Sequence, residues 1–209
     1  WGSGRTMKYH STCLVLKDGQ MDDNLVAFCD LQLSSELPET GFVRSVMHEY
    51  NGTDWARNII WMKGKYWVIM DQMKVREPAD YSIFCQWMGA GHSVDEDYHT
   101  SLTQHDHTLH LQAAGGTRPI VTPVGVGDDR PVIRQGSHGE LAQGEALTFA
   151  QVLYGHENTR PVDYSIKRVS DNTCLITEPE REVLLGVAPA DQQGEPVALG
   201  RQLRANCTM

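Results

Sequence analysis

The hydrophobic positions of the chain fall in short runs in which they alternate with polar positions. The runs are rich in Val, Ile, Tyr, Phe, Trp and Thr and end at Gly, Asp, Asn or Pro, whereas the spacing of an amphipathic helix is scarce. The pattern predicts strands over residues 8–16, 25–33, 42–50, 57–62, 66–73, 81–88, 109–113, 146–154, 164–169, 173–177, 182–187 and 197–203. Residues 146–154 also suit a short helix, but the neighbouring runs favour a strand.

Turn residues separate these runs. The clearest hairpin joins residues 57–62 to residues 66–73 across a Lys-Gly-Lys turn at 63–65. Residues 114–145 carry much of the Gly and Pro, and prolines interrupt a long ladder of backbone hydrogen bonds. We therefore expect loops with short strands in that stretch.

About a dozen strands without intervening helices must bury one face each against another sheet. The sequence therefore predicts the all-β class and a two-sheet antiparallel β-sandwich, with a closed barrel as the alternative. The 209 residues suit one domain, residues 1–209. Sandwiches of this kind host many unrelated functions, so the fold class alone names none.

Composition excludes two classes of partner. Asp and Glu total 27 against 18 Lys and Arg, a formal net charge of −9, which argues against nucleic-acid binding because that depends on concentrated positive charge. No apolar stretch approaches the roughly 20 residues of a membrane span. The five cysteines include no CxxC pair, and Cys13, Cys29 and Cys85 lie in apolar runs where a thiol usually packs as a small hydrophobe.

Histidines form the densest group of candidate metal ligands. His99, His105, His107 and His110 fall in one short segment, and on a strand His105 and His107 would share a face while His110 points the other way. His99 or an acid from residues 95–97 would then supply a third ligand. The alternative, which we favour, is a solvated strand edge without a metal.

Two further features are candidates for chemistry. Tyr9 and His10 precede an apolar strand, and a His beside a Tyr can transfer protons or bind a metal, although the two side chains can also lie on opposite faces of an edge strand. Aromatic residues crowd one third of the chain, and most of them are expected to fill the core. Trp55, in a turn over residues 51–55, is the candidate for an exposed platform on which a sugar ring stacks.

The order of these segments resembles the heparinase II/III-like polysaccharide lyases. TMKYHSTCLVLKDGQ (residues 6–20) resembles a family strand with a His followed by Asn/Ser-Thr and an Asp-Gly turn. YNGTDWARNIIWMKGKYWVIMDQM (50–73) is similar to a family hairpin that carries an Arg and ends in Asp. YSIFCQWMG and GEALTFAQVLYG fall where family members have strands of the trailing sandwich, so the likeness runs from about residue 6 to 188.

This resemblance implies that the chain is the C-terminal β-sandwich that follows an (α/α) toroid. Family lyases cleave uronic-acid polysaccharides, such as glycosaminoglycans or alginate, by β-elimination, with most catalytic groups in the toroid or at its junction with the sandwich. The catalytic candidates are then His10, which matches a family position, and Tyr9 beside it, and the substrate-binding candidates are Arg57, which matches a family hairpin position, and the Trp55 platform. The partners implied are an acidic polysaccharide and the toroid, and the location is periplasmic or secreted. Without a toroid the isolated chain is expected to be inactive.

The resemblance also implies a zinc ion. His10 matches a family histidine near a structural zinc site in the sandwich, a site that also draws on an upstream HxHxD-like segment, so this chain is expected to hold only part of it. Arg57 and Asp71 match hairpin positions and are expected to pair across neighbouring strands. The alternative to the lyase reading is a stand-alone carbohydrate-binding or structural sandwich without catalysis, in which the Trp55 region contacts sugar.

Overall fold

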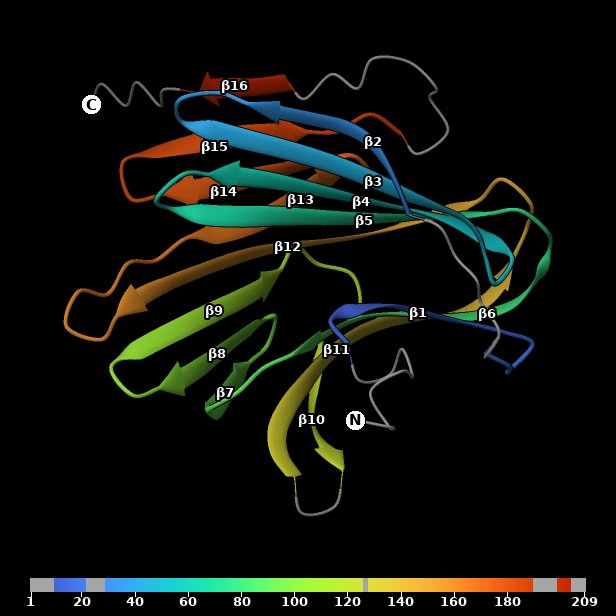
Figure 1. The fold of residues 1–209 in the computed structure, drawn as a ribbon, viewed down its shortest axis with the longest axis horizontal. Coiled ribbons are helices and arrows are strands. Elements are labelled where there is room, and N and C mark those ends of the chain that lie inside the picture. Colours follow the sequence, from blue (N-terminus) through green and yellow to red (C-terminus); the bar gives the residue numbers. More distant parts are fainter. Residues whose placement is uncertain (1–9, 22–28, 126–127, 190–198, 204–209) are drawn as a thin grey trace.

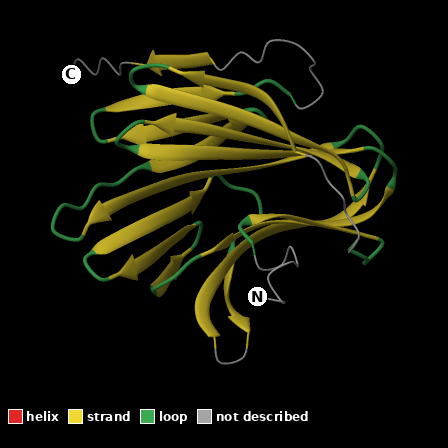
Figure 2. Cartoon of the chain, in the orientation of Figure 1, coloured by secondary structure: helices red, strands yellow, loops and turns green. Residues whose placement is uncertain are grey.

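The computed structural model describes residues 10–21, 29–125, 128–189 and 199–203, and this part of the chain forms strands and turns without a helix (Figures 1 and 2). The strands are β1 (Thr12–Lys17), β2 (Cys29–Glu36), β3 (Thr40–Tyr50), β4 (Thr53–Met62), β5 (Tyr66–Val75), β6 (Ala79–Met88), β7 (His92–Glu96), β8 (His99–Gln104), β9 (His107–Ala113), β10 (Ile120–Gly125), β11 (Asp128–Leu141), β12 (Ala146–Glu157), β13 (Ser165–Ser170), β14 (Thr173–Glu178), β15 (Arg181–Gly186) and β16 (Leu199–Leu203). The predicted all-β class is confirmed. The described residues contain no helix long and apolar enough to cross a membrane.

The strands form three antiparallel sheets. Sheet A has the order β1-β6-β11-β10, sheet B the order β2-β3-β4-β5-β12-β9-β8-β7, and sheet C the order β13-β14-β15-β16. The predicted 57–73 hairpin is β4 and β5, which pair from Thr53 with Val75 to Met62 with Tyr66. The ambiguous run at 146–154 is a strand, β12, and it lies between β5 and β9 in the middle of sheet B.

Sheet B is the central layer, with sheet C against one face and sheet A against part of the other (Figure 1). Alternation along β4 and β5 explains both contacts. Ile60, Val68 and Met70 join the core shared with sheet C, while Trp55 and Met73, one step out of phase, join the core shared with sheet A. The sandwich prediction is confirmed, and the third sheet adds a layer that strand patterns alone do not reveal.

Residues 114–145 are more regular than expected. The prediction of loops with short strands is wrong for β11, a 14-residue strand that pairs with both β10 and β6. Pro131 lies opposite Pro123 of the edge strand β10, and its carbonyl accepts a hydrogen bond from the Gly89 N–H, so its own missing N–H lies on the β6 side, one residue before the ladder to β6 starts. The ladder from β11 to β6 begins at Val132 and is therefore uninterrupted.

Candidate functional site

A buried polar cluster lies where sheet A meets sheet B. Asp71 of β5 is fully buried and accepts two parallel hydrogen bonds from Arg57 of β4, from Nε to Oδ1 at 2.7 Å and from Nη2 to Oδ2 at 2.9 Å. Trp55 donates its indole N–H to Asp71 Oδ1 at 2.8 Å. Arg57 and Asp71 are direct partners on the two strands, so the expected cross-strand pair is present.

The surroundings keep the Arg57 guanidinium charged. Burial by itself would lower the pKa of the Arg57 guanidinium, but the adjacent Asp71 carboxylate more than offsets burial and raises that pKa above its usual value. The guanidinium carbon also lies 5.0 Å from the Trp55 ring and 5.3 Å from the Trp87 ring. Arg57 is therefore held as a cation between two aromatic rings, with its charge compensated by Asp71.

Two thiols complete the cluster. Cys13 of β1 and Cys85 of β6 are direct cross-strand partners in sheet A, both have 0% exposure, and both are free thiols. Cys85 Sγ lies 3.5 Å from Asp71 Oδ2, and burial raises the pKa of the Cys13 thiol well above its usual value. One donor atom each from Cys13, Asp71 and Cys85 lies within 4.8 Å of the other two, so this group could hold a metal ion.

His10 lies beside this cluster at the start of the β1 segment. Its side chain is exposed, and its backbone carbonyl accepts a hydrogen bond from Gln86 at 2.7 Å. The next carbonyl, that of Ser11, lies 3.5 Å from Arg57 Nη1. The structure thus brings the His10 segment against Arg57, whereas Tyr9 falls outside the described residues.

The zinc site implied at His10 does not fit the described residues. The ring is exposed, and the one group of three donor side chains that the described residues bring together does not include it. A zinc ion held by His10 would need ligands from elsewhere, and no catalytic step is derived through it.

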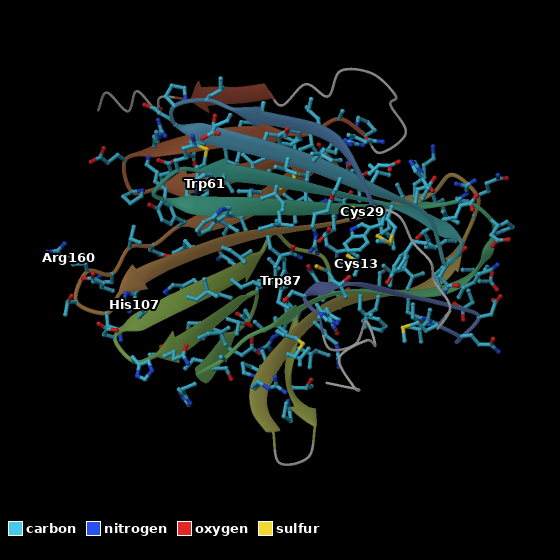
Figure 3. All side chains as sticks on the ribbon, in the orientation of Figure 1. Cys13, Cys29, Trp61, Trp87, His107 and Arg160 are labelled. Carbon is cyan, nitrogen blue, oxygen red and sulfur yellow. The ribbon has the colours of Figure 1, made fainter. Side chains whose placement is uncertain are left out.

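The expectation that Trp55 is exposed is wrong. It is the third residue of β4 and is 8% exposed, because the chain reverses before it and its ring points toward sheet A. The exposed tryptophans of this sheet are Trp61 and Trp67, at 39% and 41%. They lie on the same face of β4 and β5 as Trp55 and Asp71. Trp61 lies at the end of β4 away from Cys13 of sheet A (Figure 3).

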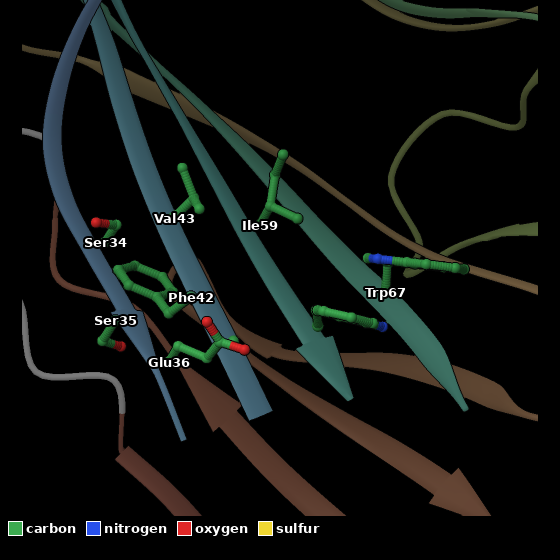
Figure 4. Close-up of a pocket in the computed structure, with 9 residues that line it drawn as sticks. Ser34, Ser35, Glu36, Phe42, Val43, Ile59 and Trp67 are labelled. Atoms are coloured by element: carbon green, nitrogen blue, oxygen red, sulfur yellow. The ribbon is translucent and has the colours of Figure 1, made fainter. Parts of the chain in front are cut away.

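Trp61 and Trp67 form one wall of a surface groove. They are direct cross-strand partners, and their rings stack with centroids 6.3 Å apart and planes within 7°. The groove has a volume of about 420 Å³. It is also lined by residues of β2, β3 and β4, from which Val43 and Ile59 project on the same side of the sheet (Figure 4): Ser34, Ser35, Glu36, Gly41, Phe42, Val43 and Ile59.

The histidine-rich segment is arranged differently from the predicted cluster. His105 lies in the turn between β8 and β9 with φ of 56°, and His107 pairs with Asp106 at the surface, so these two do not converge on a ligand. Instead His110 Nδ1 lies 2.8 Å from His99 Nε2, and His110 Nε2 lies 2.9 Å from His156 Nε2. His156, on β12, belongs to this histidine row and was missed because only strand pairing brings it beside β9.

Hydrogen bonding fixes the proton positions in the histidine row. His156 Nδ1 lies 2.9 Å from a backbone carbonyl, which can only accept, so this nitrogen carries the proton and Nε2 is the acceptor. His110 therefore donates from Nε2 and accepts at Nδ1 from His99. Burial, with the neighbouring rings of His99 and His156, lowers the pKa of His110 to about 4.

We expect the histidine row to make stability depend on acid pH. Because the folded pKa of His110 lies below the unfolded value of 6.5, the unfolded state binds the proton more readily, and stability is lost as the pH falls from 6.5 to about 4. The ring is partly exposed, so solvent screening reduces the expected loss to about 1–2 kcal/mol. Urea unfolding at both ends of this range measures it.

The matched variant for this test is His110→Phe, which keeps the stacking on Tyr154, where the ring centroids are 4.6 Å apart, and removes the titrating group. Its unfolding free energy should vary less with pH than that of the unmodified chain. The same change at exposed His92 should leave the pH dependence as it was. Equal pH dependence in the unmodified chain and in His110→Phe would show that His110 is not responsible.

The sequence matches no protein family model and no curated protein. The fold is nevertheless similar to solved structures. Heparan sulfate lyase HepC from Pedobacter heparinus matches with a TM-score of 0.66 and 14% identity, over 90% of this chain and 31% of that one. A heparinase III gene product matches with a TM-score of 0.62 and 14% identity, over 94% of this chain and 30% of that one.

A further heparinase III structure matches with a TM-score of 0.56 and 12% identity, over 91% of this chain and 29% of that one. At these identities the likeness concerns the fold. The chain spans about three tenths of the length of the proteins that it matches. The predicted resemblance to the sandwich of heparinase II/III-like lyases is therefore confirmed at the level of the fold.

Proposed function

We propose that this chain is the β-sandwich of a heparinase II/III-like polysaccharide lyase and supports β-elimination of uronic-acid polysaccharides together with an (α/α) toroid. The observation that carries the proposal is the match of 90% of this chain to 31% of a heparan sulfate lyase. Because the match covers less than a third of that protein, the rest of its length can form a second domain. The proposal includes a periplasmic or secreted location, where a polymeric substrate is accessible.

β-Elimination needs groups for three steps, and the described residues provide candidates for few of these steps. The uronate carboxylate must be neutralised, a base must remove the adjacent proton, and an acid must protonate the leaving oxygen. His10 is exposed and can exchange protons with a substrate. Arg57 is a weaker candidate for substrate binding, because its Nε and Nη2 are occupied by Asp71. We assign Arg57 to positioning the segment that carries His10.

The charge of the chain supports a division of labour between two domains. Three cations of the β4–β5 region are already in ion pairs: Lys63 with Glu36, Lys65 with Glu178, and Arg76 with Asp54. With a net charge of −9, the chain would repel an acidic polymer at long range. We therefore assign most of the attraction for the substrate to the toroid.

The test compares the 209-residue chain with the gene product that includes any coding sequence before Trp1. The isolated chain should release no unsaturated uronate from heparan sulfate, chondroitin sulfate or alginate, and the longer product should release it from at least one. In the longer product His10→Ala should lower kcat by about 100-fold or more, since a proton-transfer group contributes about 10²–10⁴-fold. His92→Ala is the control, because His92 lies on the edge strand β7.

Activity of the isolated chain would contradict the division of labour between two domains. A start codon directly before Trp1, or a longer product without lyase activity, would contradict the lyase proposal itself. Unchanged kcat in His10→Ala would remove only the role assigned to His10.

A second function, glycan binding without catalysis, is favoured by the groove beside Trp61 and Trp67. Stacked, half-exposed indole rings offer the flat apolar surface on which sugar rings pack, and Ser34 and Ser35 supply hydroxyl groups beside them. Trp67→Ala should weaken binding of a neutral oligosaccharide by about 10-fold in calorimetry. Tyr98→Ala, at an exposed aromatic residue elsewhere, should not. Equal affinities of both variants would exclude the groove as the binding site.

A further inference from the structure

The interface between sheets A and B contains two thiols and a carboxylate that share one small volume. Cys13, Cys85 and Asp71 each have 0% exposure, and they come from three strands, β1, β6 and β5. Their apolar neighbours include Val15, Ile83 and Met73. Apolar side chains at these three positions would fill the interface equally well. Two thiols and a carboxylate in their place suggest that the group has a chemical role.

We propose that Cys13, Cys85 and Asp71 form a binding site for one divalent, thiolate-preferring cation such as zinc. Two sulfurs and one oxygen are a ligand set that suits this class of ion. Bonds of about 2.3 Å to sulfur and about 2.0–2.2 Å to oxygen put tetrahedral ligand atoms roughly 3.5–3.8 Å apart. Cys85 Sγ is already 3.5 Å from Asp71 Oδ2, and all three donor atoms lie within 4.8 Å of one another.

The charges balance with and without the ion. In its absence burial raises the pKa of the Cys13 thiol, and the charge of the Asp71 carboxylate is balanced by the Arg57 guanidinium. When a divalent cation binds, both S–H bonds break, two protons leave to solvent and two metal–sulfur bonds form. Two thiolates, one carboxylate, one guanidinium and the cation then sum to zero charge, so no net charge is buried.

Neighbouring groups orient the ligands. Asp71 is fixed by Trp55 on Oδ1 and by Arg57 on both oxygens, which leaves Oδ2 facing Cys85. Such outer contacts are typical of metal-binding carboxylates. Gln151 of β12 is 1% exposed, and its amide lies 3.6–3.8 Å from Cys85 Sγ, where its oxygen can serve as a fourth ligand. An ion at this site would join sheet A to sheet B.

Cobalt(II) tests this site directly, because its thiolate complexes absorb light by charge transfer from sulfur. The reduced 209-residue chain, kept in a thiol-free phosphine reductant, should bind one Co²⁺ with a charge-transfer band and release two protons per ion. Zinc should displace the cobalt and abolish the band. Zinc should also raise the unfolding temperature, because an ion that binds only the folded state stabilises it.

The chain contains its own control cysteines. Cys13→Ala and Cys85→Ala should each lose the band, while Cys29→Ala, at an exposed cysteine, and Cys174→Ala, in the core with sheet C, should keep it. Unfolding curves recorded with a chelator establish that each variant is folded. A reduced chain without a band, or a band that persists in the Cys13→Ala/Cys85→Ala double variant, would overturn the proposal. The proposal would also be overturned if Cys13 and Cys85 formed a disulfide in the oxidised chain and the reduced chain then bound no cobalt.

Discussion

Asp71→Ala is expected to lower the free energy of unfolding by about 3–5 kcal/mol, the range for breaking a buried ion pair from one side. The substitution leaves the Arg57 guanidinium, whose side chain is 17% exposed, without its carboxylate. It also removes the acceptor of the Trp55 indole N–H, which is buried with Asp71. The guanidinium and the indole N–H are then buried without a hydrogen-bond acceptor, which costs their desolvation free energy. A small cavity also opens between sheets A and B.

Urea unfolding in the presence of a chelator measures this loss, and the chelator keeps any bound metal from contributing. Glu36→Ala is the matched control, because Glu36 also pairs with a cation, Lys63, but its side chain is 78% exposed. Solvent screens an exposed pair of this kind, so the control should differ little from the unmodified chain.

A double variant separates loss of the partner from loss of packing. Arg57→Met in the Asp71→Ala background removes the uncompensated cation and should recover part of the lost stability, by about 1 kcal/mol or more. If Asp71→Ala alone costs less than the exposed control, the pair does not stabilise the junction of sheets A and B. If the double variant is less stable than Asp71→Ala, the cost lies in packing rather than in the buried charge.

Local patterns along the chain were sufficient to predict β2, β3, β4, β5, β9 and β12 of sheet B, but not β7 and β8, which lie in a polar stretch without hydrophobic alternation. Alternation in residues 57–62 and 66–73 identifies most of β4 and β5, and the Lys-Gly-Lys turn fixes their pairing, so the Arg57–Asp71 pair follows from the sequence. The burial of Trp55 did not follow from the sequence, which predicted an exposed ring. Trp55, Ile59 and Trp61 lie on one face of β4, and which of them is covered depends on where sheet A ends.

The cluster of thiols could not be predicted from one sequence. Cys13 meets Cys85 because β1 pairs with β6, and four strands of the central sheet separate these two along the chain. A pairing of this kind carries no turn signal, unlike a hairpin. His156 could not be assigned to the histidine row for the same reason. Its strand, β12, pairs with β9, but β10 and β11, which lie between them along the chain, belong to another sheet.

Glu178→Ala is expected to destabilise the contact between sheets B and C by about 2–4 kcal/mol. Glu178, on β14, accepts hydrogen bonds from Tyr66 at 2.8 Å, from Lys65 at 2.7 Å and from Arg181 at 2.9 Å. Its side chain is 3% exposed, so the substitution leaves the Tyr66 hydroxyl, at the boundary of the larger core, without its acceptor.

The pH dependence of stability identifies the carboxylate as the cause. Burial by itself would raise the pKa of Glu178, but hydrogen bonds from Arg181, Lys65 and Tyr66 hold that pKa below its usual value of 4.5. A depressed folded pKa stabilises the folded state above the unfolded pKa, and this stability is lost as the pH falls through the folded pKa. Glu178→Gln, which keeps the shape but does not titrate, should therefore lose less stability in acid than the unmodified chain.

A cycle with Tyr66→Phe tests the bond that joins the two sheets. If Tyr66 and Glu178 act through their hydrogen bond, the two substitutions should couple by about 0.5–3 kcal/mol in denaturant unfolding near neutral pH. Additive effects would mean that Glu178 acts through its ion pairs with Lys65 and Arg181 and not through the Tyr66 hydroxyl. The junction of sheets B and C would then depend on its apolar core and on the Lys65–Glu178 pair, whereas at the junction of sheets A and B the buried Arg57–Asp71 pair lies between the layers.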